Sequence, residues 1–218
     1  MENKRPVIFL ARPSMGYIHE VLWITLMQWI VSGKYKWQIA PSMRVSPHHR
    51  ARNFLHREFT RQDETMHFDY VLWCDSDTIP PEDALEKFIA HDKDVVCGAV
   101  HTWRAFGPFF VAWNRVDEGF RVVDPKQWKG LQKVDIGTLS FCLMKADVLR
   151  AMPPGCFYWE ETDEWHTEGH SEDTVFFNQV AEHGFEVYVD FDTPCDHMKE
   201  IGMLHVAELL GKGKQDDE

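Results

Sequence analysis

Apolar residues in the first hundred positions follow two patterns in turn. Short continuous apolar runs, typical of strands buried on both faces, occur at residues 7–10, 70–74 and 95–97, and residues 37–40, interrupted by Gln38, also indicate a strand. Between them, apolar residues recur every three or four positions, which is the period of a helix with one buried face; these stretches are residues 18–32 and 47–61 and one that begins near Pro80. Strands that alternate with helices in this way predict an α/β fold with a largely parallel sheet.

The pattern changes after Gly98. The further elements that we predict are strands at residues 109–113, 119–123, 141–144 and 185–191, and helices at residues 146–151 and 172–183. A chain of 218 residues fits a single domain. We divide it into one half at residues 1–100, a second half at residues 101–210 and a flexible tail at residues 211–218.

Composition narrows the classes of function. The chain has 23 Lys and Arg against 35 Asp and Glu, a formal net charge of −12, so a broad basic face for nucleic acid is not expected. Acidity does not exclude an anionic substrate, because a divalent cation held by carboxylates reverses the local charge. The longest apolar stretch, residues 21–31, is too short for a membrane span. The five cysteines form no C-x-x-C pair, so we expect a reducing, cytoplasmic location without disulfides.

Two aspartates follow the strand at residues 70–74. If Asp75 and Asp77 are extended, their carboxylates point to the same side, at the strand end where ligands of open α/β sheets collect. Hard oxygen ligands suit Mg²⁺ or Mn²⁺. The alternative is a turn whose acids cap the helix near Pro80. Residues 75–78 (D-S-D-T) also resemble the D-x-D-x-T motif of haloacid-dehalogenase-type phosphatases, in which the first aspartate is a nucleophile, with the threonine one position early.

Several segments together resemble a GT-A glycosyltransferase of the small, family-2-like kind found in bacteria and phages. They are residues 50–55 (R-A-R-N-F-L), 70–81, 92–99, 134–145 and 171–177, followed by His197. The resemblance implies a GT-A (Rossmann-like) α/β fold with a mixed, mostly parallel sheet flanked by helices. It also implies that residues 1–100 bind a nucleotide sugar and residues 101–210 bind the acceptor. In one departure from the family, Leu139 and Ser140 replace the glycine expected after residues 137–138.

The resemblance assigns donor-side roles to particular positions. Asp77 and His197 would bind Mn²⁺ or Mg²⁺, with Asp75 either a ligand through water or close to the ribose. The residues on the nucleotide side would be Pro13, Arg52, Asn53, Asp75 and Arg104. Without the resemblance, His197 reads as a surface histidine and Arg52 as a solvated helix residue.

The acid pair at residues 172–173 is the candidate catalytic group. In the family reading, Asp173 takes the proton from an acceptor hydroxyl and Glu172 orients the acceptor, as general-base chemistry requires. The simpler interpretation is that both acids complement the dipole of a helix whose N-cap is Ser171. The two interpretations are compatible.

The implied activity is metal-dependent transfer of a sugar from a nucleotide diphosphate sugar, with a UDP-sugar favoured, to an acceptor hydroxyl, with inversion. A glycan, a small molecule, a protein or a modified nucleic-acid base remains open as the acceptor, and the location would be the host cytoplasm if the gene is viral. The alternatives are a nucleotide- or sugar-binding module of the same fold without turnover, and the D-x-D-x-T phosphatase.

Overall fold

The computed structural model describes residues 4–14, 16–40, 45–104, 107–117, 119–163 and 169–198, with the backbone alone at residues 103–104 and 107–108. The first elements are β1 (Val7–Ala11), α1 (Glu20–Val31), β2 (Lys36–Ile39), α2 (His48–Met66), β3 (Tyr70–Cys74), β4 (Thr78–Ile79), α3 (Ala84–His91) and β5 (Val95–Arg104). They are followed by β6 (Gly107–Phe110), β7 (Trp113–Val116), β8 (Gly119–Val122), a 3₁₀ turn (Pro125–Gln127), β9 (Leu131–Val134), β10 (Phe141–Lys145), α4 (Ala146–Ala151), β11 (Glu160–Glu161), β12 (Gly169–His170), α5 (Glu172–Glu182) and β13 (Val187–His197).

A nine-stranded sheet runs through the described part of the chain in the order β2-β1-β3-β10-β5-β13-β4, with β6 paired to β5 and β9 to β13. The pairs β1–β2, β1–β3 and β5–β13 are parallel. β10 lies antiparallel between β3 and β5, so β2, β1, β3, β5 and β13 all point in one direction. The sheet is therefore mixed and mostly parallel.

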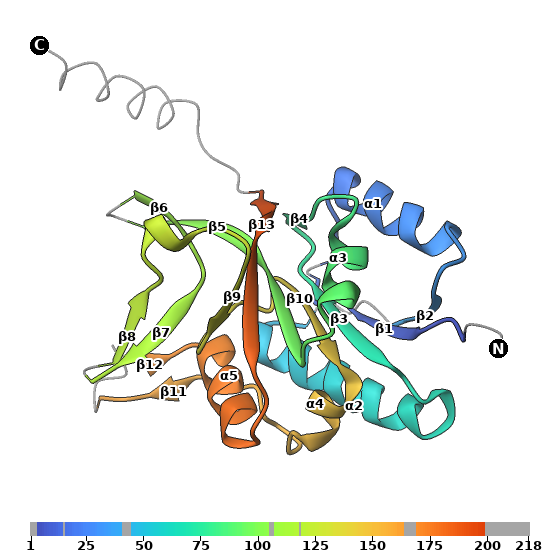
Figure 1. The fold of residues 1–218 in the computed structure, drawn as a ribbon. Coiled ribbons are helices and arrows are strands. Elements are labelled where there is room, and N and C mark those ends of the chain that lie inside the picture. Colours follow the sequence, from blue (N-terminus) through green and yellow to red (C-terminus); the bar gives the residue numbers. More distant parts are fainter. Residues whose placement is uncertain are drawn as a thin grey trace, which may run out of the picture.

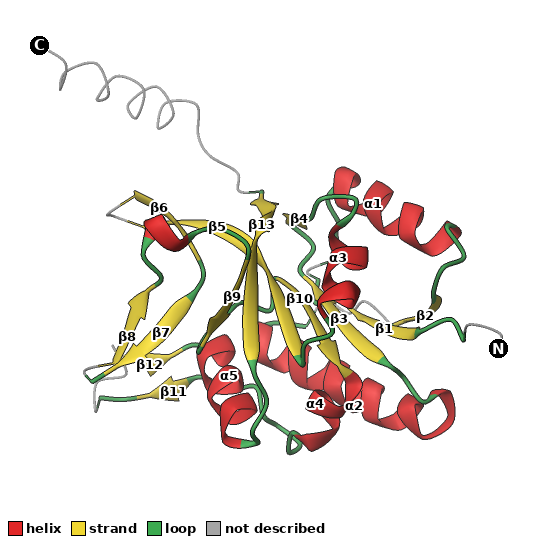
Figure 2. Ribbon diagram, viewed as in Figure 1, coloured by secondary structure: helices red, strands yellow, loops and turns green. Residues whose placement is uncertain are grey.

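Helices cover both faces of this sheet (Figure 1). Side chains of successive strand residues point to opposite faces, and this alternation divides the interior into two hydrophobic clusters. Phe9 and Val71 pack in the cluster that includes residues of α2, α4 and α5. Leu10 and Leu72 pack in the cluster that includes residues of α1 and α3. The result is a helix–sheet–helix sandwich (Figure 2), and the predicted α/β class is confirmed.

The structure also corrects element boundaries. β3 and α4 have the predicted bounds, but β5 continues to Arg104 because its second half pairs with β6. β13 extends to His197 through a register shift between Asp190 and Pro194. β4, β9, β11 and β12 were not predicted, because two to four residues carry no readable period. No helix among the described residues is both long and apolar enough to cross a bilayer.

Candidate active site

The strand directions bring the predicted site residues to one edge of the sheet. Pro13 follows the carboxyl end of β1, Asp75 follows that of β3, and His197 ends β13. Because these strands run parallel, their carboxyl ends meet at the same edge, where open α/β sheets bind ligands. β10 runs the other way, so its amino end lies there too, and Ser140 accepts a backbone hydrogen bond from Asp75 N–H at 2.8 Å.

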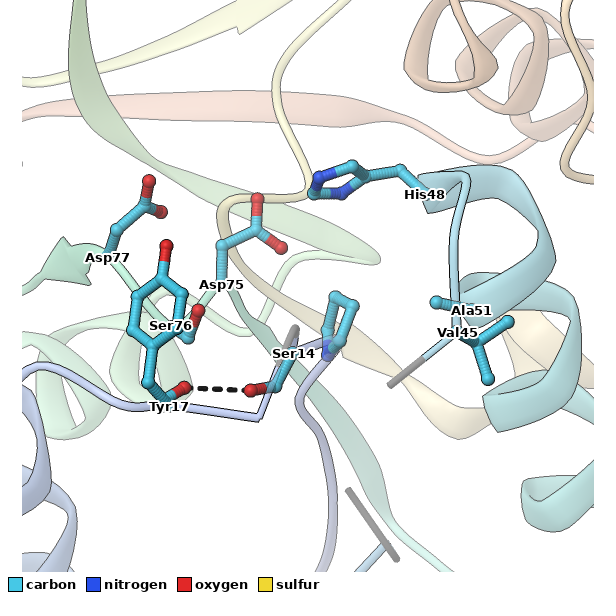
Figure 3. A pocket seen from close by; sticks show the side chains of 9 residues that line it. Ser14, Tyr17, Val45, His48, Ala51, Asp75, Ser76 and Asp77 are labelled. Carbon is cyan, nitrogen blue, oxygen red and sulfur yellow. Dashed lines mark hydrogen bonds between the residues drawn. The ribbon is translucent and has the colours of Figure 1, made fainter. Parts of the chain in front are cut away.

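A pocket opens at this edge between the loop after β1, the start of α2 and the acidic loop after β3. Its lining residues are Pro13, Ser14, Tyr17, Val45, His48, Ala51, Asp75, Ser76 and Asp77. In Figure 3, Tyr17 and Asp77 lie on one side of the Asp75 carboxylate and His48 lies on the other. The two loops are tied together, because His19 N–H donates to the Ser76 carbonyl at 2.9 Å.

Asp77 and His197 are held side by side by the short antiparallel pairing of β4 with β13, in which Thr78 opposes His197. The His197 Nδ1 atom lies 3.2 Å from the His101 carbonyl; a carbonyl only accepts, so Nδ1 carries the hydrogen. The His197 Nε2 atom lies 3.5 Å from Asp77 Oδ2. An imidazole and a carboxylate this close together, with the imidazole oriented by a backbone carbonyl, suit a shared cation.

Beneath the pocket, a buried arginine joins three carboxylates. The Arg52 side chain is 2% exposed, and its nitrogens lie 3.4 Å from Asp75 Oδ1, 3.6 Å from Glu172 Oε1 and 3.6 Å from Asp173 Oδ1. Burial alone would lower the pKa of Arg52, but the three carboxylates raise it. Nε and Nη1 have no hydrogen-bond partner within the described ranges. The cluster is thus held by charge more than by hydrogen bonds.

Asp173 sits in the first turn of α5, where the Ser171 side chain caps the helix by accepting from Thr174 N–H. Its Oδ2 accepts from Leu139 N–H at 3.1 Å and lies 3.3 Å from the Thr138 hydroxyl. Burial is the largest cause that raises the pKa of Asp173, to about 6; Arg52 opposes this rise and Glu172 adds to it. A carboxylate with a pKa near neutrality is suited to accept a proton during a reaction.

The structure therefore brings only some of the predicted site residues together in the pocket. Pro13, Asp75 and Asp77 share the pocket, whereas Arg52 lies buried beneath it. Asn53 lies outside the pocket lining, and its amide holds the backbone of Phe157, donating to the carbonyl at 2.6 Å and accepting from the N–H at 3.2 Å. The side chain of Arg104 is outside what the structure describes.

Other residues of the site were not foreseen from the sequence. Tyr17 and His48 line the pocket but belong to no motif, because their place depends on how α1 and α2 approach the sheet. Thr138 belongs to the segment at residues 134–145 that carries part of the family resemblance. Its contact with Asp173 explains in structural terms why that segment belongs to the site. Over the described part of the chain, no three His, Cys, Asp or Glu side chains come close enough together to hold a metal by themselves.

Comparisons with known proteins show the fold. No family model and no curated protein sequence matches the chain. The crystal structure of A197 from STIV is similar over 89% of this chain and 86% of that one, with a TM-score of 0.57 and 18% identity. The crystal structure of GalNAc-T7 with UDP, GalNAc and Mn²⁺ matches 92% of this chain, with a TM-score of 0.50 and 9% identity. The match spans only 45% of that longer chain.

A weaker similarity, with a TM-score of 0.37 and 11% identity, covers 66% of this chain and 62% of a glycosyltransferase involved in the glycosylation of the major capsid of PBCV-1; a score this low supports no argument. The first two similarities confirm the GT-A, Rossmann-like fold, a mixed and mostly parallel sheet flanked by helices.

Proposed function

We propose that this protein is a metal-dependent glycosyltransferase that moves a sugar from a nucleotide diphosphate sugar to an acceptor hydroxyl, with inversion. The observation that carries the proposal is the arrangement at the sheet edge. Asp77 lines the same pocket as Asp75 and pairs with His197, and Arg52 links Asp75 to Asp173. The GT-A fold of the similar structures supports it.

The donor set fits Mn²⁺ or Mg²⁺. One carboxylate and one imidazole leave coordination positions for phosphate oxygens and water, which is how such ions are commonly bound with nucleotide substrates. We assign Asp77 and His197 as the ligands, with Asp75 acting through water or on the ribose. When bound, the ion would neutralise charge that develops on the departing diphosphate.

The pocket beside Asp75 is the proposed place for the nucleoside. Pro13 and Tyr17 give it an apolar wall, and His48 gives it a polar one. A UDP-sugar is the favoured donor, and the similar GalNAc-T7 structure contains UDP and Mn²⁺. Arg52 is buried under Asp75 rather than open to the pocket, so we assign it to positioning the carboxylates and not to gripping phosphate.

Asp173 is the proposed base. Its Oδ2 is held by Leu139 and Thr138, and its buried Oδ1 has an ion-pair contact with Arg52 but no hydrogen-bond partner within the described ranges. The proton of the acceptor hydroxyl passes to the Asp173 carboxylate as the hydroxyl oxygen bonds to the anomeric carbon. The bond from that carbon to the diphosphate oxygen breaks, and its electron pair leaves with the diphosphate. Positioning and charge stabilisation supply most of such catalysis.

The test is a panel of nucleotide sugars with and without Mn²⁺, followed by release of nucleoside diphosphate. We expect metal-dependent release that is lost in Asp77→Asn and His197→Gln. Asp173→Asn should bind UDP with Mn²⁺ normally and lose transfer by about 100-fold or more, the size of a general-base contribution. Asp83→Asn, an exposed aspartate paired with Lys87 on α3, is the matched control.

Three outcomes would contradict the proposal. Nucleotide-sugar binding without turnover under acceptor screening would indicate a binding module. Phosphate release from simple monoesters that depends on Asp75 would indicate the phosphatase. Transfer that is unaffected by Asp173→Asn would remove the base from its role.

A further inference from the structure

A second hollow, with aromatic walls, lies at the start of α5, the helix that carries Asp173. Its lining residues are Trp113, Phe120, Ile136, His170 and Thr174, and its volume is about 170 Å³. None of these residues has a role in the chemistry described above.

Chain connections place this aromatic hollow beside the segments that hold Asp173. Thr174 directly follows Asp173 in α5. Ile136 stands two residues before Thr138, and the loop that it enters donates the Leu139 N–H to Asp173 Oδ2. His170 directly precedes the Ser171 cap of α5. Three of the five lining residues therefore come from the same segments that hold Asp173.

The aromatic wall is built by the β7–β8 hairpin. Trp113 opposes Val122, so Phe120 lies two residues further along on the same face of the pair. Trp113 is anchored to Ile136 by backbone hydrogen bonds in both directions, at 2.9 and 3.0 Å. The Phe120 ring meets the His170 ring edge-on at 5.9 Å between centroids. The Trp113 and Phe120 side chains are both half-buried, so packing holds the two rings in place while part of each still faces the hollow.

The chemistry of the walls favours a neutral ring with an apolar face and a polar rim. The residues that line the hollow include no lysine or arginine. The nearby Arg115 lies over the Phe120 ring at 5.1 Å and donates to Asn178 Oδ1 at 2.7 Å, so its guanidinium is held between that ring and α5 and is not part of the lining. A net charge of −12 also disfavours a polyanion such as nucleic acid. A cavity of this size has room for about one sugar ring and is too small for a typical drug-sized ligand.

We propose that the aromatic hollow is the acceptor subsite and that it binds a neutral carbohydrate, whose C–H face stacks on Trp113 and Phe120 while a hydroxyl reaches Asp173. This inference rests on the proposed function, because it gives the base its substrate. His170 and the Thr174 hydroxyl would bind ring hydroxyls at the rim. The acceptor class is therefore a glycan and not a modified nucleic-acid base.

The test uses the full chain without donor or metal, so that its result is independent of turnover. Saturation-transfer NMR is recorded with the methyl glycosides of glucose, galactose, mannose, N-acetylglucosamine and N-acetylgalactosamine. We expect at least one glycoside to receive saturation at its ring protons, and its Kd to rise about tenfold or more in the double variant Trp113→Leu/Phe120→Leu. Leucine keeps the apolar packing, and circular dichroism checks that the variant is folded.

Trp23→Leu is the matched control, because Trp23 is an exposed tryptophan on α1, outside the lining of the hollow; it should bind the glycosides as the unaltered protein does. If transfer is found, Trp113→Leu should raise the acceptor KM about tenfold, whereas Trp23→Leu should leave both the acceptor KM and donor hydrolysis unchanged. If no transfer is found but glycosides still bind through Trp113, the proposed function fails and the hollow stands as a carbohydrate-binding site without an acceptor role. Absence of glycoside binding, equal binding by the double variant, or nucleosides bound at these rings in place of glycosides would overturn the inference.

Discussion

Arg52 carries one positive charge among three carboxylates, and the whole group is largely withdrawn from water. Removing one partner from a buried ion pair is costly, because it leaves the other charges uncompensated. Here the loss of Arg52 would leave Asp75, Glu172 and Asp173 together without a cation. The residue therefore has a structural role at the centre of the candidate site.

We predict that Arg52→Met lowers the free energy of unfolding at pH 7 by about 3–5 kcal/mol, measured by urea denaturation. The loss should shrink as the pH falls and the carboxylates become protonated. Arg61→Met on the same helix is the control, since Arg61 is 67% exposed and pairs with Glu58 at the surface; its loss should stay below about 1 kcal/mol. Equal losses in the two variants would show that the buried cluster is not important for stability.

Asp173 combines its proposed catalytic role with a cost in stability. Its pKa is raised from 3.8 to about 6 in the folded protein, so the folded state binds the proton more tightly than the unfolded chain does. Stability is therefore unaffected below pH 4, falls as the pH rises through 4 to 6, and stays reduced above that range. A shift of this size corresponds to about 3 kcal/mol as an upper value.

We predict that Asp173→Asn raises the free energy of unfolding by about 1–3 kcal/mol at pH 7 and that this gain vanishes near pH 4, measured by urea denaturation at the two pH values. In the unaltered enzyme, kcat/KM for transfer should fall as the pH drops below about 6, because the base becomes protonated. A gain in stability that is equal at both pH values would contradict the assignment.

At the scale of elements, the loop that enters β10 controls where Asp173 points. Gly137 lies against β5 so closely that an added Cβ would be 2.6 Å from the Cys97 sulfur. Glycine is therefore required for the close approach of the loop to the sheet. One residue further, the loop presents Thr138 and Leu139 to Asp173.

We predict that Gly137→Ala lowers the free energy of unfolding by about 1–3 kcal/mol, as overpacking does, and reduces kcat because the loop moves away from Asp173. Cys97→Ala removes the sulfur that the new methyl group would meet. The double variant Gly137→Ala/Cys97→Ala should therefore recover part of both losses, and a double-mutant cycle measures the coupling. Strict additivity would show that the contact is not the cause.

The sequence predicted the long periodic elements and failed where the structure depends on tertiary contacts. β3 and α4 matched because an apolar run or a helical period carries its own signal. In α2 the helical period places Arg52 on the same face as Leu55 and Phe59, but it does not show which carboxylates Arg52 meets there. Asp75 and Asp77 were singled out from their place after a buried strand, and the roles of Glu172, Asp173 and His197 were implied by the family resemblance. The pairing of β4 with β13, which joins Asp77 to His197, has no sequence signature.

At the scale of the whole molecule, the net charge of −12 repels an anionic donor. Asp75, Asp77, Glu172 and Asp173 lie at or beneath the candidate site, so the repulsion is strongest where a diphosphate would bind. A divalent cation reverses the local charge. Binding of donor and metal should therefore be strongly coupled.

We predict that UDP alone leaves the melting temperature unchanged, whereas UDP with Mn²⁺ at about 100 times the dissociation constant raises it by about 5–10 °C, from about 2.7 kcal/mol of binding linkage. EDTA should abolish the shift, and His197→Gln should remove most of it. A full shift in EDTA, measured by differential scanning calorimetry, would show that UDP binds without the metal.

The place of β13 in the sheet has a consequence for folding during synthesis. It is the last described element to leave the ribosome, yet Val187 pairs with Val95 across a loop of roughly 90 residues. Until it arrives, one side of β5 has no parallel neighbour, and an unpaired edge invites aggregation. We expect fragments that stop before residue 187 to be insoluble, so the donor-binding and acceptor-binding halves, although distinct in their proposed tasks, cannot be produced as separate proteins.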